Sequence, residues 1–67
     1  MQLITQAAQF QIMEEQVCAG AITDYSLAYE LLLDVLKLDY GSLDNLDMQP
    51  LDPKAVADFI KWMQSEE

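Results

Sequence analysis

Histidine and arginine are absent from this chain of 67 residues, and there is a single cysteine, Cys18. Without histidine, zinc sites built from His and Cys are excluded by inventory, as are nucleophilic centres of the Ser–His or Cys–His type. One cysteine excludes an internal disulfide, so a chain this small has to rely on a well-packed core or on oligomerisation. The lack of disulfides fits a reducing compartment, and we predict a cytoplasmic protein.

Glycine and long apolar runs are also scarce. The two glycines, Gly20 and Gly41, are isolated, so no phosphate-cradling loop is present. No stretch approaches the roughly 20 apolar residues of a membrane span, and the first residues lack the pattern of a signal peptide. We therefore expect a single domain over residues 1–67, with no membrane association, no cofactor and no metal.

Positive charge is limited to three lysines, which face twelve acidic residues and leave a net charge of −9. A strongly acidic chain is not expected to bind nucleic acid or anionic lipid directly, because both require a basic surface. Two interpretations of the acidity stay open. It either serves only solubility or steers the protein onto a partner protein with a basic patch.

Helical periodicity begins near the start of the sequence. Residues 2 to about 18 place five apolar side chains on one broad face, namely Leu3, Ala7, Phe10, Met13 and Val17. Cys18, near the edge of that face, is expected to be a small buried hydrophobe. Gly20 would end this helix, and Thr23 or Asp24 would cap the next one. So short a connection predicts that the two helices are antiparallel.

The segment from Asp24 to Tyr40 is too apolar for a helix with only one covered face. One of its sides carries Leu27, Leu31, Val35 and Leu38. Another side carries Tyr25, Tyr29, Leu32, Leu36 and Tyr40. We expect the two neighbouring helices to cover one side each. The alternative is that the tyrosine side is a binding or dimer surface, because tyrosine is enriched at interface hot spots.

Residues 41–52 contain recurring Leu-Asp pairs and predict an acidic loop, with a short helical turn near residues 42 to 47. The spacing of Asp44, Asp47 and Asp52 does not follow that of a calcium-binding loop, and turn or cap roles explain these aspartates more simply. Asp52 and Pro53 predict the start of a third helix. Its apolar face consists of Val56, Phe59, Ile60 and Met63. At the edge of this face, Trp62 is either a core-edge aromatic or an exposed anchor for a partner.

Asp24-Tyr25-Ser26-Leu27, at the start of a helix, is similar to the Asp-Ser-Leu motif of acyl and peptidyl carrier proteins. The late segment Val56-Ala57-Asp58-Phe59-Ile60 is similar to the last helix of that family. The resemblance implies that Ser26 would be the attachment site of phosphopantetheine. The sequence departs from the family motif at Tyr25, which separates the aspartate from the serine.

A second resemblance is to the acidic helical immunity proteins that neutralise nuclease toxins. It rests on Thr23-Asp24-Tyr25-Ser26 opening a helix, on the acidic balance and on a late helix that contains tryptophan. The resemblance implies a mechanism in which a small acidic helical protein covers a basic functional surface of its partner.

The sequence thus predicts an all-α domain of three helices, with the third packed across the first two after the acidic loop. We expect a non-catalytic inhibitor or adaptor that binds a partner with a basic patch. The predicted contact residues are the aspartates Asp39, Asp44, Asp47 and Asp52 and the aromatic residues Tyr25, Tyr29, Tyr40 and Trp62. Two alternatives are a carrier-like protein modified at Ser26 and a structural subunit of a homo-oligomer such as a homodimer.

Overall fold

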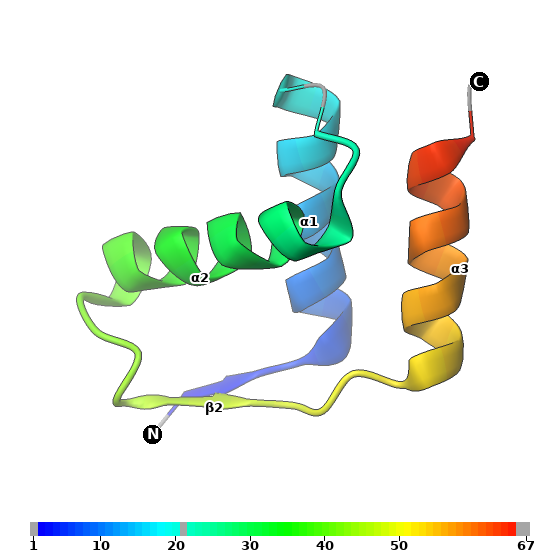
Figure 1. Ribbon diagram of the computed structural model, residues 1–67. Helices are drawn as coiled ribbons and strands as arrows, with labels where there is room; N and C mark the ends of the chain where they lie inside the picture. Colours follow the sequence, from blue (N-terminus) through cyan, green and yellow to red (C-terminus); the bar gives the residue numbers. More distant parts are fainter. Residues whose placement is uncertain (1, 21, 66–67) are drawn as a thin grey trace.

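The computed structural model describes residues 2–20 and 22–65 of the protein (Figure 1). The elements in chain order are β1 (Gln2–Ile4), α1 (Gln6–Gly20), α2 (Tyr25–Tyr40), β2 (Leu46–Met48) and α3 (Pro53–Gln64). Three helices hold most of the described residues, which confirms the prediction of a small all-α domain. The two short strands are an addition that the sequence did not predict.

The strands β1 and β2 pair in parallel. This pairing brings the segment before α1 next to the segment after α2. Gln2 lies opposite Leu46, and Ile4 lies opposite Met48. The backbone N–H of Gln49 extends this pairing by donating to the carbonyl oxygen of Ile4 at 2.9 Å. The prediction of helix from residue 2 is therefore wrong. Near residues 42 to 47 the structure has a single turn, in which the backbone N–H of Leu46 donates to the carbonyl oxygen of Leu43 at 3.1 Å, followed directly by β2. Pairing between distant segments overrides local helical periodicity here.

The predicted boundaries of α2 are confirmed by its caps. The Asp24 carboxylate accepts a hydrogen bond from the backbone N–H of Ser26 at 3.0 Å. At the other end, Gly41 has a φ of 81°, a left-handed conformation that glycine adopts without a steric penalty. Its N–H donates to the carbonyl oxygen of Lys37 at 2.8 Å. Both ends of α2 are thus fixed by local chemistry that the sequence reveals.

The starts of α1 and α3 are also capped by side chains. The hydroxyl oxygen of Thr5 accepts a hydrogen bond from the backbone N–H of Ala8 at 3.2 Å. The carboxylate of Asp52 accepts one from the backbone N–H of Lys54 at 3.3 Å, and Pro53 occupies the first turn. The predicted beginning of α3 is confirmed, whereas α1 begins at Gln6, after the strand.

The three helices meet at Phe59 of α3. Its ring stacks on Phe10 of α1 with centroids 5.3 Å apart, and it meets Tyr25 of α2 edge-on at 6.1 Å. Figure 1 shows α2 running steeply across α1 rather than back along it, so the antiparallel arrangement is not confirmed. The helices α1 and α3 both run upward in that view.

The core lies between the three helices and β1. Its buried apolar side chains are Ile4, Met13, Ala28, Leu32, Leu36, Phe59 and Met63. The predicted apolar face of α3 is confirmed, because Phe59 and Met63 are buried while Val56 and Ile60 are half-buried.

The buried face of α1 agrees with the prediction in part, because Met13 is buried and Phe10 and Val17 pack against the core. Gln9 and Met13 are the buried residues of this helix, whereas Leu3 and Ala7 are exposed. Cys18 is exposed as well, so its predicted burial is wrong. At about 100° per residue, Cys18 lies roughly 140° around the helix from Met13 and points away from the core. The prediction failed because it extended the helical phase back into residues that form β1.

The helix α2 is covered on one side only. Ala28, Leu32 and Leu36 are buried, whereas Leu27 is 45% exposed and Leu38 is 85% exposed. The prediction that the neighbouring helices cover both apolar sides is therefore wrong. The core meets α2 on the Ala28–Leu32–Leu36 side, and the side that carries Leu27 and Leu38 is left to solvent.

Candidate functional site

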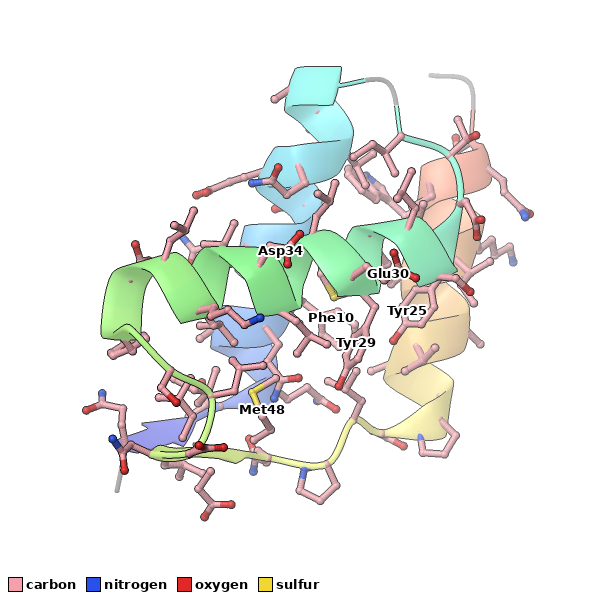
Figure 2. The ribbon with its side chains drawn as sticks, turned by 60° about the vertical axis from the view of Figure 1, so that its left-hand side comes forward. Phe10, Tyr25, Tyr29, Glu30, Asp34 and Met48 are labelled. Carbon is pink, nitrogen blue, oxygen red and sulfur yellow. The ribbon has the colours of Figure 1, made fainter. Side chains whose placement is uncertain are left out.

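A cavity of about 340 Å³ opens between α2, the segment that follows β2, and α3. We call it the tyrosine cavity; it is lined by Gln9, Tyr25, Tyr29, Met48, Gln49, Pro50, Leu51 and Val56. Figure 2 shows the side chains of Tyr25 and Tyr29 gathered beneath α2, with Met48 directed toward that helix from below. Two aromatic rings and several apolar side chains thus surround a concave surface that opens to solvent.

The two tyrosines form one wall of the cavity. Tyr25 and Tyr29 are one helical turn apart, and their rings stack with centroids 6.4 Å apart and an interplanar angle of 24°. Both residues are half-buried. Burial raises the pKa of the Tyr25 hydroxyl above its usual value, and the neighbouring Tyr29 adds a smaller effect in the same direction. The Tyr25 phenol is therefore neutral at physiological pH and offers an apolar ring together with a polar hydroxyl.

A buried glutamine supports the other side of the cavity. The Gln9 side chain is only 1% exposed, and its amide nitrogen donates to the carbonyl oxygens of Ile4 and Gln49 at 3.1 and 2.9 Å. One side chain of α1 thus holds both β1 and the segment after β2. The backbone of Gln49, which lines the cavity, is fixed in place by these bonds.

Two further glutamine contacts strengthen this connection. The backbone N–H of Gln6 donates to the side-chain oxygen of Gln49 at 2.7 Å. The side-chain oxygen of Gln6 in turn accepts a hydrogen bond from the backbone N–H of Asp52. We call Gln6, Gln9 and Gln49 the glutamine clamp. It ties α1 to the segment between β2 and α3, and thereby holds the wall of the tyrosine cavity that this segment forms.

The structure brings together only part of the predicted contact residues. Tyr25 and Tyr29 share the cavity, whereas Tyr40 is exposed at the far end of α2. Trp62 is exposed on α3, with its ring tilted against Phe59 at 5.4 Å. The tyrosine side predicted from the sequence is thus divided between the cavity and the end of the helix.

The predicted aspartates are exposed but do not form a single cluster. Asp39 lies at the end of α2, Asp44 precedes β2, and Asp47 belongs to β2. Asp52 is exposed too, and its carboxylate is engaged as the cap of α3. These residues give the region from the end of α2 to the start of α3 a negative surface rather than a defined binding site.

Ser26, the residue singled out by the resemblance to carrier proteins, is exposed in the first turn of α2. Its backbone N–H donates to the Asp24 cap. The hydroxyl is therefore accessible, but no contact in the described part of the chain assigns it a role. Modification of Ser26 stays a prediction.

Metal-binding side chains, membrane-spanning helices and related proteins were also considered as indications of function. Within residues 2–20 and 22–65, no group of three or more His, Cys, Asp or Glu side chains could hold a metal ion. None of the described helices has the length and apolar character needed to cross a membrane. No family model matches the chain, and neither a curated protein nor a solved structure matches it significantly.

Proposed function

We propose that this protein is a small, acidic, non-catalytic binding module that covers a basic surface of a partner protein in the cytoplasm, as an inhibitor or adaptor. The observation that carries the proposal is the tyrosine cavity within a chain of net charge −9. The negative charge supports association with the partner, and the cavity supports anchoring.

The acidic surface supports fast association with a basic partner. Asp39, Asp44 and Asp47 are exposed around β2 and the end of α2. Charges of one sign on such a surface raise the rate at which an oppositely charged protein is encountered, more than they raise affinity. The effect weakens with salt, because the screening length is about 10 Å at 0.1 M ionic strength.

The tyrosine cavity supports anchoring of one partner side chain. Its aromatic wall fits the alkyl stem of a lysine or arginine, whose charged end gains additional stabilisation from the ring faces. Tyrosine is also enriched among residues that dominate binding energy at protein interfaces. Because the glutamine clamp already holds the cavity walls, little ordering is required on binding, which favours affinity.

The test uses a basic protein encoded beside this one, since small binding modules of this kind are expected to be encoded with their partners. Association and dissociation rates are measured by surface plasmon resonance at 50 to 500 mM NaCl, for the wild type and for Tyr29→Ala. We expect the association rate to fall with salt, and Tyr29→Ala to weaken binding at least about tenfold, mainly through faster dissociation.

Gln11→Ala is the matched control, because Gln11 is exposed on α1 and does not line the cavity. Its rates should equal those of the wild type. An association rate that does not change with salt would contradict the electrostatic part of the proposal. Unchanged binding by Tyr29→Ala would contradict the anchoring part.

The exposure of Ser26 favours one second candidate, a carrier-like function. It is tested by incubation with coenzyme A and a phosphopantetheinyl transferase, followed by intact-mass measurement. A mass increase that Ser26→Ala abolishes would support this candidate over the binding module, and an unchanged mass would eliminate it.

A further inference from the structure

Four apolar side chains on the outer side of α2 form a continuous row. Leu27, Leu31, Val35 and Leu38 follow one another at intervals of four, four and three residues, which places them within an arc of about 80° on the helix. We call them the leucine row. Leu27 and Leu38 are exposed, and Leu31 and Val35 are half-buried.

The row is separate from the core of the domain. Leu31 and Val35 do not belong to the described side chains that form the core or pack against it. The centre of the row lies roughly 100° around α2 from the buried Ala28–Leu32–Leu36 side. Single exposed leucines are common on protein surfaces, but an aligned row with Leu38 at 85% exposure is a contiguous apolar surface.

One edge of the leucine row is acidic. Glu30 and Asp34 follow this edge, and Figure 2 shows both on α2, above Tyr25 and Tyr29. The opposite edge borders the buried Ala28–Leu32–Leu36 side, and Asp39 is exposed beyond that edge only at the end of the helix. Lys37, the one cation of α2, lies beyond Glu30 and outside the row. An apolar row with acids along one edge is complementary to an apolar helix face with basic residues beside it.

We propose that the leucine row docks an amphipathic helix of a partner protein, with lysine or arginine beside its apolar face. Helices recognise such surfaces through apolar anchors spaced three and four residues apart, and the row offers the matching spacing. The inference shares with the proposed function only the basic character of the partner. The row and the tyrosine cavity lie on different sides of α2, so each is tested by its own substitutions.

Charge disfavours a second copy of this chain as the occupant. Each copy carries a net charge of −9, so self-association brings two strongly acidic surfaces together. If two copies paired through the centre of the row, the two-fold symmetry axis of the dimer would pass between Leu31 and Val35. The two copies of Asp34 would then lie on either side of this axis. Like charges in such positions are destabilising, whereas a basic helix would neutralise them.

The test uses a synthetic amphipathic Leu–Lys peptide of about 18 residues, or five helical turns, labelled with fluorescein. Binding is measured by fluorescence anisotropy with three comparison peptides: the same peptide with glutamate in place of lysine, a shuffled Leu–Lys peptide without helical periodicity, and the unlabelled competitor. We expect the wild type to bind the amphipathic Leu–Lys peptide at least tenfold more tightly than the shuffled or glutamate peptides.

The deciding variant is Leu27→Gln/Leu38→Gln, whose two positions are exposed and therefore compatible with folding. We expect it to bind the Leu–Lys peptide at least tenfold more weakly than the wild type. Leu3→Gln is the matched control, since Leu3 is 54% exposed on β1, and Tyr29→Ala reports on the cavity. Both should stay within twofold of the wild type, and circular dichroism verifies the fold of every variant.

Three results would overturn the inference. They are equal peptide binding by the wild type and the double variant, equal binding of the shuffled peptide, and absence of peptide binding. A wild-type dimer in sedimentation that becomes a monomer in Leu27→Gln/Leu38→Gln would overturn it as well, in favour of a second copy. Any of these results leaves the tyrosine cavity, and the proposed function with it, untouched.

Discussion

At the scale of single residues, Gln9 has a structural role that is unusual for a glutamine. Glutamine is usually exposed on helices, yet this side chain is buried and joins α1 to the carbonyl groups of Ile4 and Gln49. A buried amide is stable only when it is hydrogen-bonded, and both of these bonds cross between distant parts of the chain. Gln9 therefore links the fold to the cavity.

Replacing Gln9 with methionine keeps the volume but removes both hydrogen bonds. We expect Gln9→Met to lower the free energy of unfolding by about 1–3 kcal/mol, because the Gln49 carbonyl loses its partner. Urea denaturation followed by circular dichroism measures the loss. The matched control, Gln11→Met, alters an exposed glutamine of the same helix and should change stability by less than about 0.5 kcal/mol. Equal effects of the two substitutions would contradict the clamp.

The raised pKa of the Tyr25 hydroxyl predicts a loss of stability at alkaline pH. Burial raises the pKa of its hydroxyl above 10.0, so the folded protein retains the proton to higher pH than the unfolded chain does. The resulting contribution to stability is complete below about pH 10 and is lost as pH rises through the pKa of the folded state. We expect Tyr25→Phe to lose less stability than the wild type as the pH rises above the usual pKa of tyrosine, about 10.

Thermal unfolding at a series of pH values measures this difference. Tyr40→Phe is the control, because Tyr40 is exposed at the end of the same helix, and its pH dependence should follow that of the wild type. Parallel curves for the wild type and Tyr25→Phe would show that burial of this phenol does not affect the stability of the fold.

At the scale of elements, α2 combines a buried side, an aromatic wall and an exposed apolar row. Leu32 is fully buried, and we expect Leu32→Ala to destabilise the protein by about 2–5 kcal/mol, through lost burial and the cavity left behind. The control is Leu38→Ala on the same helix, which should change stability by less than about 0.5 kcal/mol. Chemical denaturation compares the two, and a large effect of Leu38→Ala would show that the leucine row is covered within the fold.

The cap of α3 provides a second prediction at this scale. Asp52→Ala removes the carboxylate that accepts the backbone N–H of Lys54, and we expect a loss of about 0.5–2 kcal/mol. Asp58→Ala removes an exposed aspartate from the middle of the same helix, so it controls for the change in net charge. The midpoint of urea denaturation distinguishes the two variants. A loss of stability shared by both would assign the effect to charge rather than to capping.

The sequence predicts those features that depend on neighbouring residues. The caps of α2 and α3, the glycine that ends α2 and the apolar face of α3 follow from residues within a few positions of one another. The strands could not be predicted, because three-residue segments carry little signal and their partners lie at the other end of the described chain. The covered side of α2 could not be predicted either. Both of its sides are apolar, and only the placement of the other elements determines which side is buried.

The candidate site was predicted in part for the same reason. The placement of Tyr25 and Tyr29 on one side of a helix follows from their spacing. The opposite wall, formed by Met48, Pro50 and Leu51, depends on where the segment after β2 returns. Gln9 directs that return, and nothing in the sequence distinguishes this glutamine from Gln6, Gln11 and Gln16 on the same helix.

At the scale of the whole molecule, the negative charge is distributed rather than concentrated. Exposed acids occur along α2, around β2, and at the start and in the middle of α3. The tyrosine cavity and the leucine row, in contrast, are each confined to one place. Such an arrangement favours attraction of a basic partner from many directions, followed by selection through the cavity or the row. Under the proposed function, we therefore expect charge substitutions to change mainly the association rate and apolar substitutions to change mainly the dissociation rate.

The parallel pairing of β1 with β2 also sets an order of events during synthesis on the ribosome. Gln6 and Gln49, joined by a hydrogen bond, lie 43 residues apart in the chain. The strand β1 and the helices α1 and α2 are therefore synthesised before β2, and β1 lacks its partner until then. The cavity forms only after the segment that follows β2 has been made.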